Sequence, residues 1–232
     1  MGAYLSTAAT GIPTILHGLM YSGPYDIPNI KTDVYGVFTT TTPVDLYRGA
    51  GRPEATFLVE RLVDLLAAEV GKDPVEVRRL NLIPKFDNGH DVAVGLTYDS
   101  GDYPAALERA LAEVGGLEAF RTRQKDALAE GKYLGLGMGC YTEGTGVGPF
   151  EGATVKIDPT GKVIVATGAC PQGQGHETIF AQVTADTWRV PIEDVVIKLA
   201  DTSMMTMGYG TLASRSTVAS SMAIEQASDV VK

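Results

Sequence analysis

Two glycine-rich stretches in the second half of the chain carry residue types that bind anions. Residues 171–178 read Pro-Gln-Gly-Gln-Gly-His-Glu-Thr, and residues 208–217 read Gly-Tyr-Gly-Thr-Leu-Ala-Ser-Arg-Ser-Thr. Each leads into a helical pattern, and the start of a helix offers unpaired N–H groups and a partial positive charge to a phosphate or another anion. Gln174, Ser214 and Ser216 add neutral donors. Neither stretch fits the P-loop or the three-glycine dinucleotide motif, so the pattern predicts an anion site of another kind.

Side chains that catalyse reactions or bind metals do not cluster in the sequence. The three histidines, His17, His90 and His176, lie far apart, without the spacing of a metal-binding motif. The two cysteines, Cys140 and Cys170, are too few for a disulfide framework and too far apart for a zinc motif. We therefore expect no metal bound by protein side chains, and a reducing, cytoplasmic setting.

The composition is that of an ordinary globular protein. The 232 residues, 44% of them hydrophobic, are enough for one substantial core or two small ones. The formal net charge of −9 argues against a nucleic-acid partner. The sequence also contains no apolar run of membrane-spanning length and no secretory signal at the N-terminus.

The first half of the chain is predicted to be mainly helical. Residues 1–52 lack a helical period and are expected to form short extended segments, with a strand at 34–39. A helix follows from Pro53 to Val70, and its apolar face consists of Leu58, Leu62, Leu65, Leu66 and Val70. Further helices are predicted at 74–82, 104–114 and 117–130, with a polar loop at 84–102.

The second half mixes strands with helices. A strand is predicted at 134–141, a hairpin at 153–166 and another strand at 195–199. Helices follow both glycine-rich stretches, and the last continues to Lys232 without a stop signal, which is expected of a piece of a longer protein. The sequence therefore predicts an α+β fold with two modules, residues 1–130 and 131–232.

Five motifs together resemble the xanthine dehydrogenase/aldehyde oxidase family. The closest likeness is to the large, molybdenum-carrying subunits of its carbon monoxide dehydrogenase-like branch. The motifs occur in that family's order and approximate spacing, at residues 24–29, 47–54, 76–81, 173–178 and 213–217. The resemblance implies a fragment of a molybdopterin-binding large subunit. Residues 1–130 would be the C-terminal part of its first molybdopterin-binding domain, and residues 131–232 the N-terminal part of the second.

The resemblance implies one group of residues on the cofactor side of the site. Gln174 matches a family glutamine that hydrogen-bonds near the molybdenum oxo group or the pterin, and Gly173 and Gly175 would bring backbone N–H groups to the cofactor. A second cofactor-binding strip comprises Ala213, Ser214, Arg215 and Ser216. Simple helix capping remains the alternative for the two serines.

The resemblance implies a second group on the substrate side. The active-site loop comprises Arg48, Gly49, Ala50 and Gly51, in which Arg48 would orient an electron-rich substrate. A surface or interdomain salt bridge is the alternative for Arg48. Glu143 is a further candidate for lining the pocket.

The chain departs from the family pattern at three places. Gly49 stands where the carbon monoxide-oxidising enzymes carry a copper-binding cysteine, and a phenylalanine that the purine enzymes place near Ala50 is missing. Neither copper ligation nor ring stacking is therefore expected. The family's general base is a glutamate far downstream in the large subunit, and Glu225 lies in the wrong context to replace it. We therefore expect no turnover by this chain alone.

These patterns predict the molybdenum-cofactor-binding portion of a molybdenum hydroxylase. Such an oxidoreductase inserts a water-derived oxygen into a C–H bond of an aldehyde or an N-heterocycle. The implied cofactor is molybdopterin in a dinucleotide form, with iron–sulfur centres and FAD on partner subunits, so an oligomer or a complex is expected. Two alternatives remain: a non-catalytic module that binds an anion, a nucleotide or another protein, and a truncated, inactive fragment.

Overall fold

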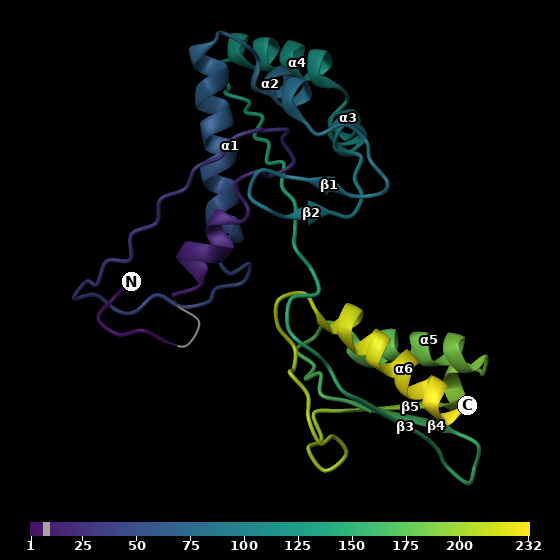
Figure 1. The fold of residues 1–232 in the computed structure, drawn as a ribbon. Helices are drawn as coiled ribbons and strands as arrows, with labels where there is room; N and C mark the ends of the chain where they lie inside the picture. The colour runs from purple at the N-terminus through teal and green to yellow at the C-terminus, as the bar shows by residue number, and fades with distance from the viewer. Residues whose placement is uncertain (7–9) are drawn as a thin grey trace. The chain divides into compact units, whose positions relative to one another are not determined.

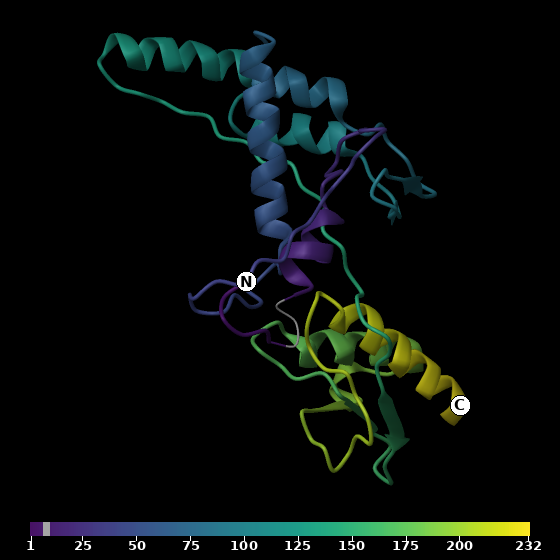
Figure 2. The same cartoon turned by 60° about the vertical axis from the view of Figure 1, so that its left-hand side comes forward.

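The chain folds into two compact units, each described here by itself. A computed structural model describes residues 1–6 and 10–232. Unit 1 comprises Met1–Glu143 and unit 2 comprises Gly144–Lys232 (Figures 1 and 2). Each unit combines helices with a small sheet, which confirms the predicted α+β class.

Unit 1 is built mainly from four α-helices. They are α1 (Arg52–Glu69), α2 (Pro74–Asn81), α3 (Tyr103–Glu113) and α4 (Leu117–Ala129), and a π-helical turn, η1 (Ile12–Leu16), precedes them. The side chain of Asp73 accepts a hydrogen bond of 2.8 Å from the Val75 N–H, and Asp102 caps α3 in the same way. The short strands β1 (His90–Asp91) and β2 (Thr97–Tyr98) pair antiparallel within the loop between α2 and α3.

The core of unit 1 gathers side chains from all four α-helices. Its buried members are Tyr25, Val59, Val75, Leu82, Leu107, Leu111 and Leu117. The predicted strand at 134–141 is wrong: this segment is extended, but it pairs with no strand of the described chain. Leu136, Met138 and Cys140 instead pack against the helical core. Because this segment packs on the helices, the boundary between the two units lies after Glu143. The sequence predicted a domain boundary at residue 130.

The predicted strand at 34–39 is also absent. Residues 26–46 form a long loop that contains no helix or strand (Figure 2). The Met1 amino group donates to the Val37 carbonyl, and the Thr39 N–H donates to the Gly2 carbonyl. These isolated bonds do not make a ladder, and Tyr35 is 84% exposed. Within the described ranges, no strand pairs with the β-favouring residues of this segment to form a sheet.

Unit 2 is a three-stranded sheet covered by two helices. Strands β3 (Ala153–Ile157) and β4 (Val163–Thr167) form the predicted antiparallel hairpin, and β5 (Val195–Leu199) pairs parallel with β4. Helices α5 (His176–Trp188) and α6 (Ser221–Val231) pack side by side on the sheet (Figure 1). Their shared core contains Val155, Val163, Val165, Ala169, Phe180 and Ile224. A 3₁₀ turn, η2 (Ile192–Asp194), precedes β5, and a π-helical turn, η3 (Ser216–Ser220), precedes α6.

None of the helices in the described ranges is long and apolar enough to cross a membrane.

Candidate functional site

The sheet of unit 2 brings the two glycine-rich loops to one edge. Strands β4 and β5 run parallel, and Thr167 at the end of β4 lies beside Leu199 at the end of β5. The first loop follows β4 and leads into α5, and the second follows β5 and leads into η3 and α6. The Cys170 N–H donates to Thr211 Oγ1 at 3.0 Å, which joins the two loops directly. Ligands of α/β sheets bind at such carboxyl ends of parallel strands.

The residues of the first loop, 171–175, are exposed to solvent. Gly173 and Gly175 have φ angles of 94° and 78°, in the left-handed region that favours glycine. A Cβ atom added at either position would meet nothing within 4 Å. Gly175 is the N-cap of α5, and no side chain caps this helix start. The Gln174 carboxamide accepts a 2.6 Å bond from the Gln172 N–H.

The second loop has two consecutive left-handed residues that are not glycine. Ala213 and Ser214 have φ angles of 47° and 53°. No side chain caps η3, and the Ser216 hydroxyl lies 3.3 Å from Thr211 Oγ1. Neither serine makes the helix cap that was the alternative for these positions. Arg215 differs from its neighbours because its guanidinium is buried and bound by other groups of unit 2.

The donor set of these loops fits an anionic, oxygen-rich group. Two uncapped helix starts and open glycines lie along one edge of the sheet. Glu177 in the first turn of α5 is an exposed carboxylate beside them, and the exposed side chains of Gln172, Gln174 and Ser214 are neutral amides and a hydroxyl. Such groups donate hydrogen bonds to phosphate or pterin oxygens without adding charge. His176 Nδ1 is a buried polar atom without a hydrogen-bond partner at the start of α5.

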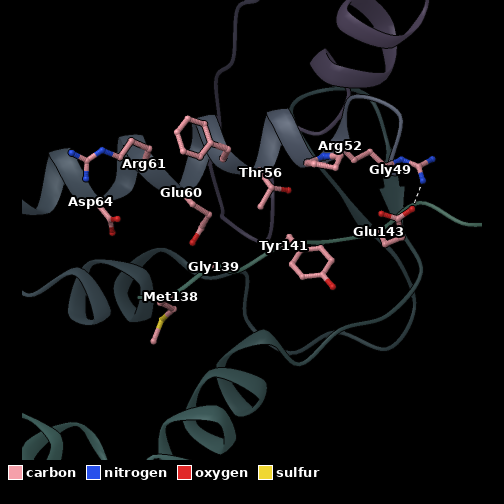
Figure 3. A pocket seen from close by; sticks show the side chains of 12 residues that line it. Gly49, Arg52, Thr56, Glu60, Arg61, Asp64, Met138, Gly139, Tyr141 and Glu143 are labelled. Atoms are coloured by element: carbon pink, nitrogen blue, oxygen red, sulfur yellow. Dashed lines mark hydrogen bonds and ion pairs between the residues drawn. The ribbon is translucent and has the colours of Figure 1, made fainter. Parts of the chain in front are cut away.

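A pocket of about 590 Å³ lies in unit 1, between α1 and the extended segment before Glu143 (Figure 3). Thr56, Glu60 and Asp64 of α1 form one wall, and Met138 and Tyr141 of the extended segment face them. The Arg52 guanidinium and the Glu143 carboxylate form an ion pair at one end of the pocket. Five of the twelve lining residues are charged, and they stand beside apolar residues such as Pro53, Phe57 and Met138. Ligand sites commonly combine apolar and charged groups.

The predicted substrate loop contributes to this pocket in part. Gly49, Ala50 and Gly51 all have positive φ angles, of 100°, 49° and 90°. Gly49 lines the pocket, whereas Arg48 is exposed and does not. The arginine that lines it is Arg52, which sequence reasoning missed. Arg52 is the first residue of α1, where the helix dipole disfavours a cation, and this anomaly could have indicated a carboxylate partner.

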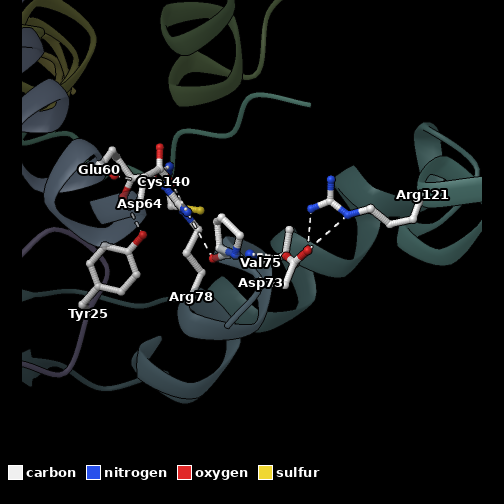
Figure 4. A network of polar contacts seen from close by, with 9 residues as sticks. Tyr25, Glu60, Asp64, Asp73, Val75, Arg78, Arg121 and Cys140 are labelled. Carbon is white, nitrogen blue, oxygen red and sulfur yellow. Dashed lines mark hydrogen bonds and ion pairs between the residues drawn. The ribbon is translucent and has the colours of Figure 1, made fainter. Parts of the chain in front are cut away.

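A buried polar network supports the wall of the pocket (Figure 4). Arg78 donates to Glu60 Oε2 through Nε at 3.0 Å and Nη2 at 2.9 Å, and to Asp64 Oδ1 at 2.9 Å. The Tyr25 hydroxyl donates to Glu60 Oε1, and the Cys140 N–H donates to Glu60 Oε2 at 2.8 Å. Glu60 thereby fixes the extended segment against α1.

Burial in this network also sets the chemistry of two titratable groups. It raises the pKa of the Tyr25 hydroxyl and of the Cys140 thiol, and the neighbouring Glu60 carboxylate raises both further. The Cys140 thiol therefore stays protonated at neutral pH and is a poor nucleophile. In the described part of the chain, no three His, Cys, Asp or Glu side chains are grouped to hold a metal.

Comparison with known proteins decides the family. Residues 110–232 match the sequence profile of a molybdopterin cofactor-binding domain, and residues 1–82 match that of another domain of the same description. The chain belongs to the molybdopterin cofactor-binding domain family. The predicted resemblance to a molybdopterin-binding large subunit is confirmed.

Three relatives show how far the similarity extends. The chain is 37% identical over 219 residues to the carbon monoxide dehydrogenase large chain of Hydrogenophaga pseudoflava, covering 88% of this chain and 27% of that protein. It is 35% identical over 222 residues to the gamma subunit of the 6-hydroxypseudooxynicotine dehydrogenase complex of Paenarthrobacter nicotinovorans, covering 94% and 28%. Quinoline 2-oxidoreductase of Pseudomonas putida 86 matches in structure with a TM-score of 0.89 and 37% identity, covering 99% and 31%. The molybdopterin-binding chain thus spans less than a third of each relative.

Proposed function

We propose that this chain is the cofactor-binding portion of a molybdenum hydroxylase and binds molybdopterin in a dinucleotide form. The observation that carries the proposal is the position of the two loops at the adjacent carboxyl ends of β4 and β5. Gly173, Gly175 and the Ala213–Ser216 backbone would donate to the pterin and its phosphates, and Gln174 would add a neutral amide. The bound cofactor would supply the molybdenum and the redox chemistry of C–H hydroxylation.

The substrate side of the proposal rests on the pocket of unit 1. Gly49 lines it, and Arg52 and Glu143 place a cation and a carboxylate at one end. We propose an N-heterocycle as the first substrate class to test and an aldehyde as the second. Two similar proteins, quinoline 2-oxidoreductase and nicotine 6-hydroxylase, are named after N-heterocyclic compounds. Iron–sulfur centres and FAD would lie on partner subunits.

Cofactor retention tests the proposal. In a host that makes molybdopterin, we expect Gly173→Ala to lower the molybdenum and pterin retained by the purified chain, because the added methyl group occupies space in front of the backbone donors. Gly161→Ala is the matched control, since Gly161 also has a positive φ and open space but lies in the β3–β4 turn. Equal retention by the two variants would contradict the assignment. A folded chain without molybdenum would favour the non-catalytic alternative.

The chain is also proposed to associate with the polypeptide that supplies the rest of a large subunit. The predicted apolar face of α1 is not covered in unit 1: Leu58, Leu62, Leu65 and Leu66 are 41–56% exposed. These positions form one stripe along the helix. An exposed stripe of this kind marks an interaction surface.

Sedimentation tests this association. We expect the chain to self-associate or to bind the remainder of the subunit, and Leu62→Glu with Leu66→Glu to weaken either contact by placing charges on the stripe. Leu128→Glu on α4 is the control, because Leu128 is equally exposed (56%) but stands on another helix. A chain that sediments as a monodisperse monomer, both alone and in the presence of the remainder of the subunit, would overturn the proposal.

A further inference from the structure

A buried ion pair lies beneath the second loop of unit 2. The side chains of Arg215 and Glu151 are both 0% exposed, and Arg215 Nη1 lies 2.8 Å from Glu151 Oε2. The same guanidinium donates to the Gly210 carbonyl at 2.9 Å and to the Phe150 carbonyl. Its Cζ also lies 4.9 Å from the centre of the Tyr209 ring. Arg215 therefore ties the loop to the segment before β3.

The carboxylate of Glu151 fixes the points from which both loops depart. Its Oε2 accepts a 3.1 Å bond from the Gly210 N–H, and its Oε1 accepts a 3.0 Å bond from the Gly152 N–H. Gly168 and Gly208 pack against each other beside it. A Cβ added at either would lie 2.6 Å from the other's Cα and 2.7 Å from Glu151 Oε1. Gly168 precedes the first loop and Gly208 begins the second.

The conformation of the second loop needs such support. Ala213 and Ser214 adopt positive φ angles, a region that residues with a Cβ avoid unless their surroundings impose it. Ser214 is followed by Arg215 in the right-handed region, with φ −101° and ψ −21°. A left-handed residue next to a right-handed one can turn neighbouring N–H groups toward one anion. In this loop the Arg215 N–H donates to the Leu212 carbonyl at 3.2 Å, so the neighbouring N–H groups would be the donors. Burying an ion pair carries a desolvation cost that makes it a poor source of stability, so a conformational role is the better explanation.

We propose that Glu151 and Arg215 are positioning residues that hold loop 208–216 in the shape that presents its backbone donors to the cofactor. The Arg215 guanidinium is 0% exposed and its terminal nitrogens donate to Glu151, Gly210 and Phe150. Its Nε has no hydrogen-bond partner in the described chain and lies beside Gly148, so the side chain acts in this proposal by holding the loop. This inference rests on the proposed function only for the identity of the ligand. The positioning of the loop is testable without any cofactor.

Amide hydrogen exchange of the full chain is the first test. We expect Glu151→Gln and Arg215→Lys to accelerate exchange of the Gly210–Ser216 amides about tenfold, while α5 and β4 amides keep their rates. Glu151→Gln removes the charge from the bond that closes the loop, and Arg215→Lys replaces a guanidinium that donates to Glu151, Gly210 and Phe150 with a single nitrogen. Tyr209→Leu is a milder variant that removes only the ring contact and should accelerate the same amides less. Ile224→Val in the core of unit 2 is the control for general destabilisation. Unchanged loop exchange, or an equal acceleration throughout unit 2, would overturn the positioning role.

Titration with inorganic pyrophosphate, followed by amide chemical shifts, is the second test. We expect both charge-pair variants to bind pyrophosphate several-fold more weakly than the parent chain, and Ile224→Val to bind it equally well. Equal binding by the pair variants and the parent would contradict the link between the pair and the donors. A parent chain that binds no pyrophosphate counts against the proposed function, and the exchange rates then decide the positioning role alone.

Discussion

Replacing Arg78 with Met is expected to lower the free energy of unfolding of unit 1 by about 3–5 kcal/mol. Arg78 is completely buried and holds the carboxylates of Glu60 and Asp64. Its removal leaves the 8% exposed Glu60 without its cation, and an uncompensated buried charge is among the most destabilising changes in a protein. The Tyr25 hydroxyl and the Cys140 N–H, which also bind Glu60, cannot replace a full positive charge.

The neighbouring residue supplies a matched control. Arg79 forms ion pairs with Glu76 and Glu108, but its side chain is 33% exposed. Arg79→Met is expected to cost about 1 kcal/mol or less, because water solvates the carboxylates that remain. Urea unfolding followed by far-ultraviolet circular dichroism would measure both variants, since the single tryptophan, Trp188, lies in unit 2 and does not report on unit 1. Equal losses of unfolding free energy in Arg78→Met and Arg79→Met would show that burial of the ion pair does not determine the size of the loss.

Local patterns in the sequence predicted most helices and the hairpin because their determinants are local. Asp73 and Pro74 start α2, and the turn at Asp158–Gly161 joins β3 to β4, as the sequence indicated. The segments at 34–39 and 134–141 have the composition of strands, but a strand also needs a partner. Whether another segment lies alongside is a long-range property that residue type does not encode.

The candidate site likewise has features that the sequence predicted and features that only the folded structure shows. The sequence singled out both glycine-rich loops from their composition, but only the parallel pairing of β4 with β5 places them side by side. Arg52 and Glu143 stand far apart in the sequence and meet because Glu60 anchors the extended segment on α1. Arg215 lies within the predicted cofactor strip, yet its side chain is engaged by Glu151 inside unit 2. Such pairings depend on tertiary packing, which spacing alone does not reveal.

Placing a cysteine at position 49 is expected to destabilise unit 1 by about 2–5 kcal/mol and not to create a copper site. The resemblance in the sequence implies that a copper-binding cysteine occupies this position in carbon monoxide-oxidising enzymes, so Gly49→Cys tests whether this loop tolerates one. Gly49 has a φ of +100°, and a Cβ there would lie 2.5 Å from both Cγ and Cδ of Pro53. The backbone strain and the clash with the proline ring both oppose the substitution.

Two further variants separate these causes. Gly71→Cys meets the same kind of backbone strain, with a φ of +65°, but nothing lies within 4 Å of its added Cβ, so it should cost only about 1–2 kcal/mol. Pro53→Ala removes both ring atoms that clash, so combining it with Gly49→Cys should recover the steric part of the loss and leave the strain. Urea unfolding gives the three free energies, and Cu(I) titration reports whether the introduced thiol binds metal. A well-folded Gly49→Cys chain that binds copper would show that the loop can adopt the carbon monoxide dehydrogenase arrangement. Failure even with Pro53→Ala would place the obstacle in the left-handed backbone at Gly49.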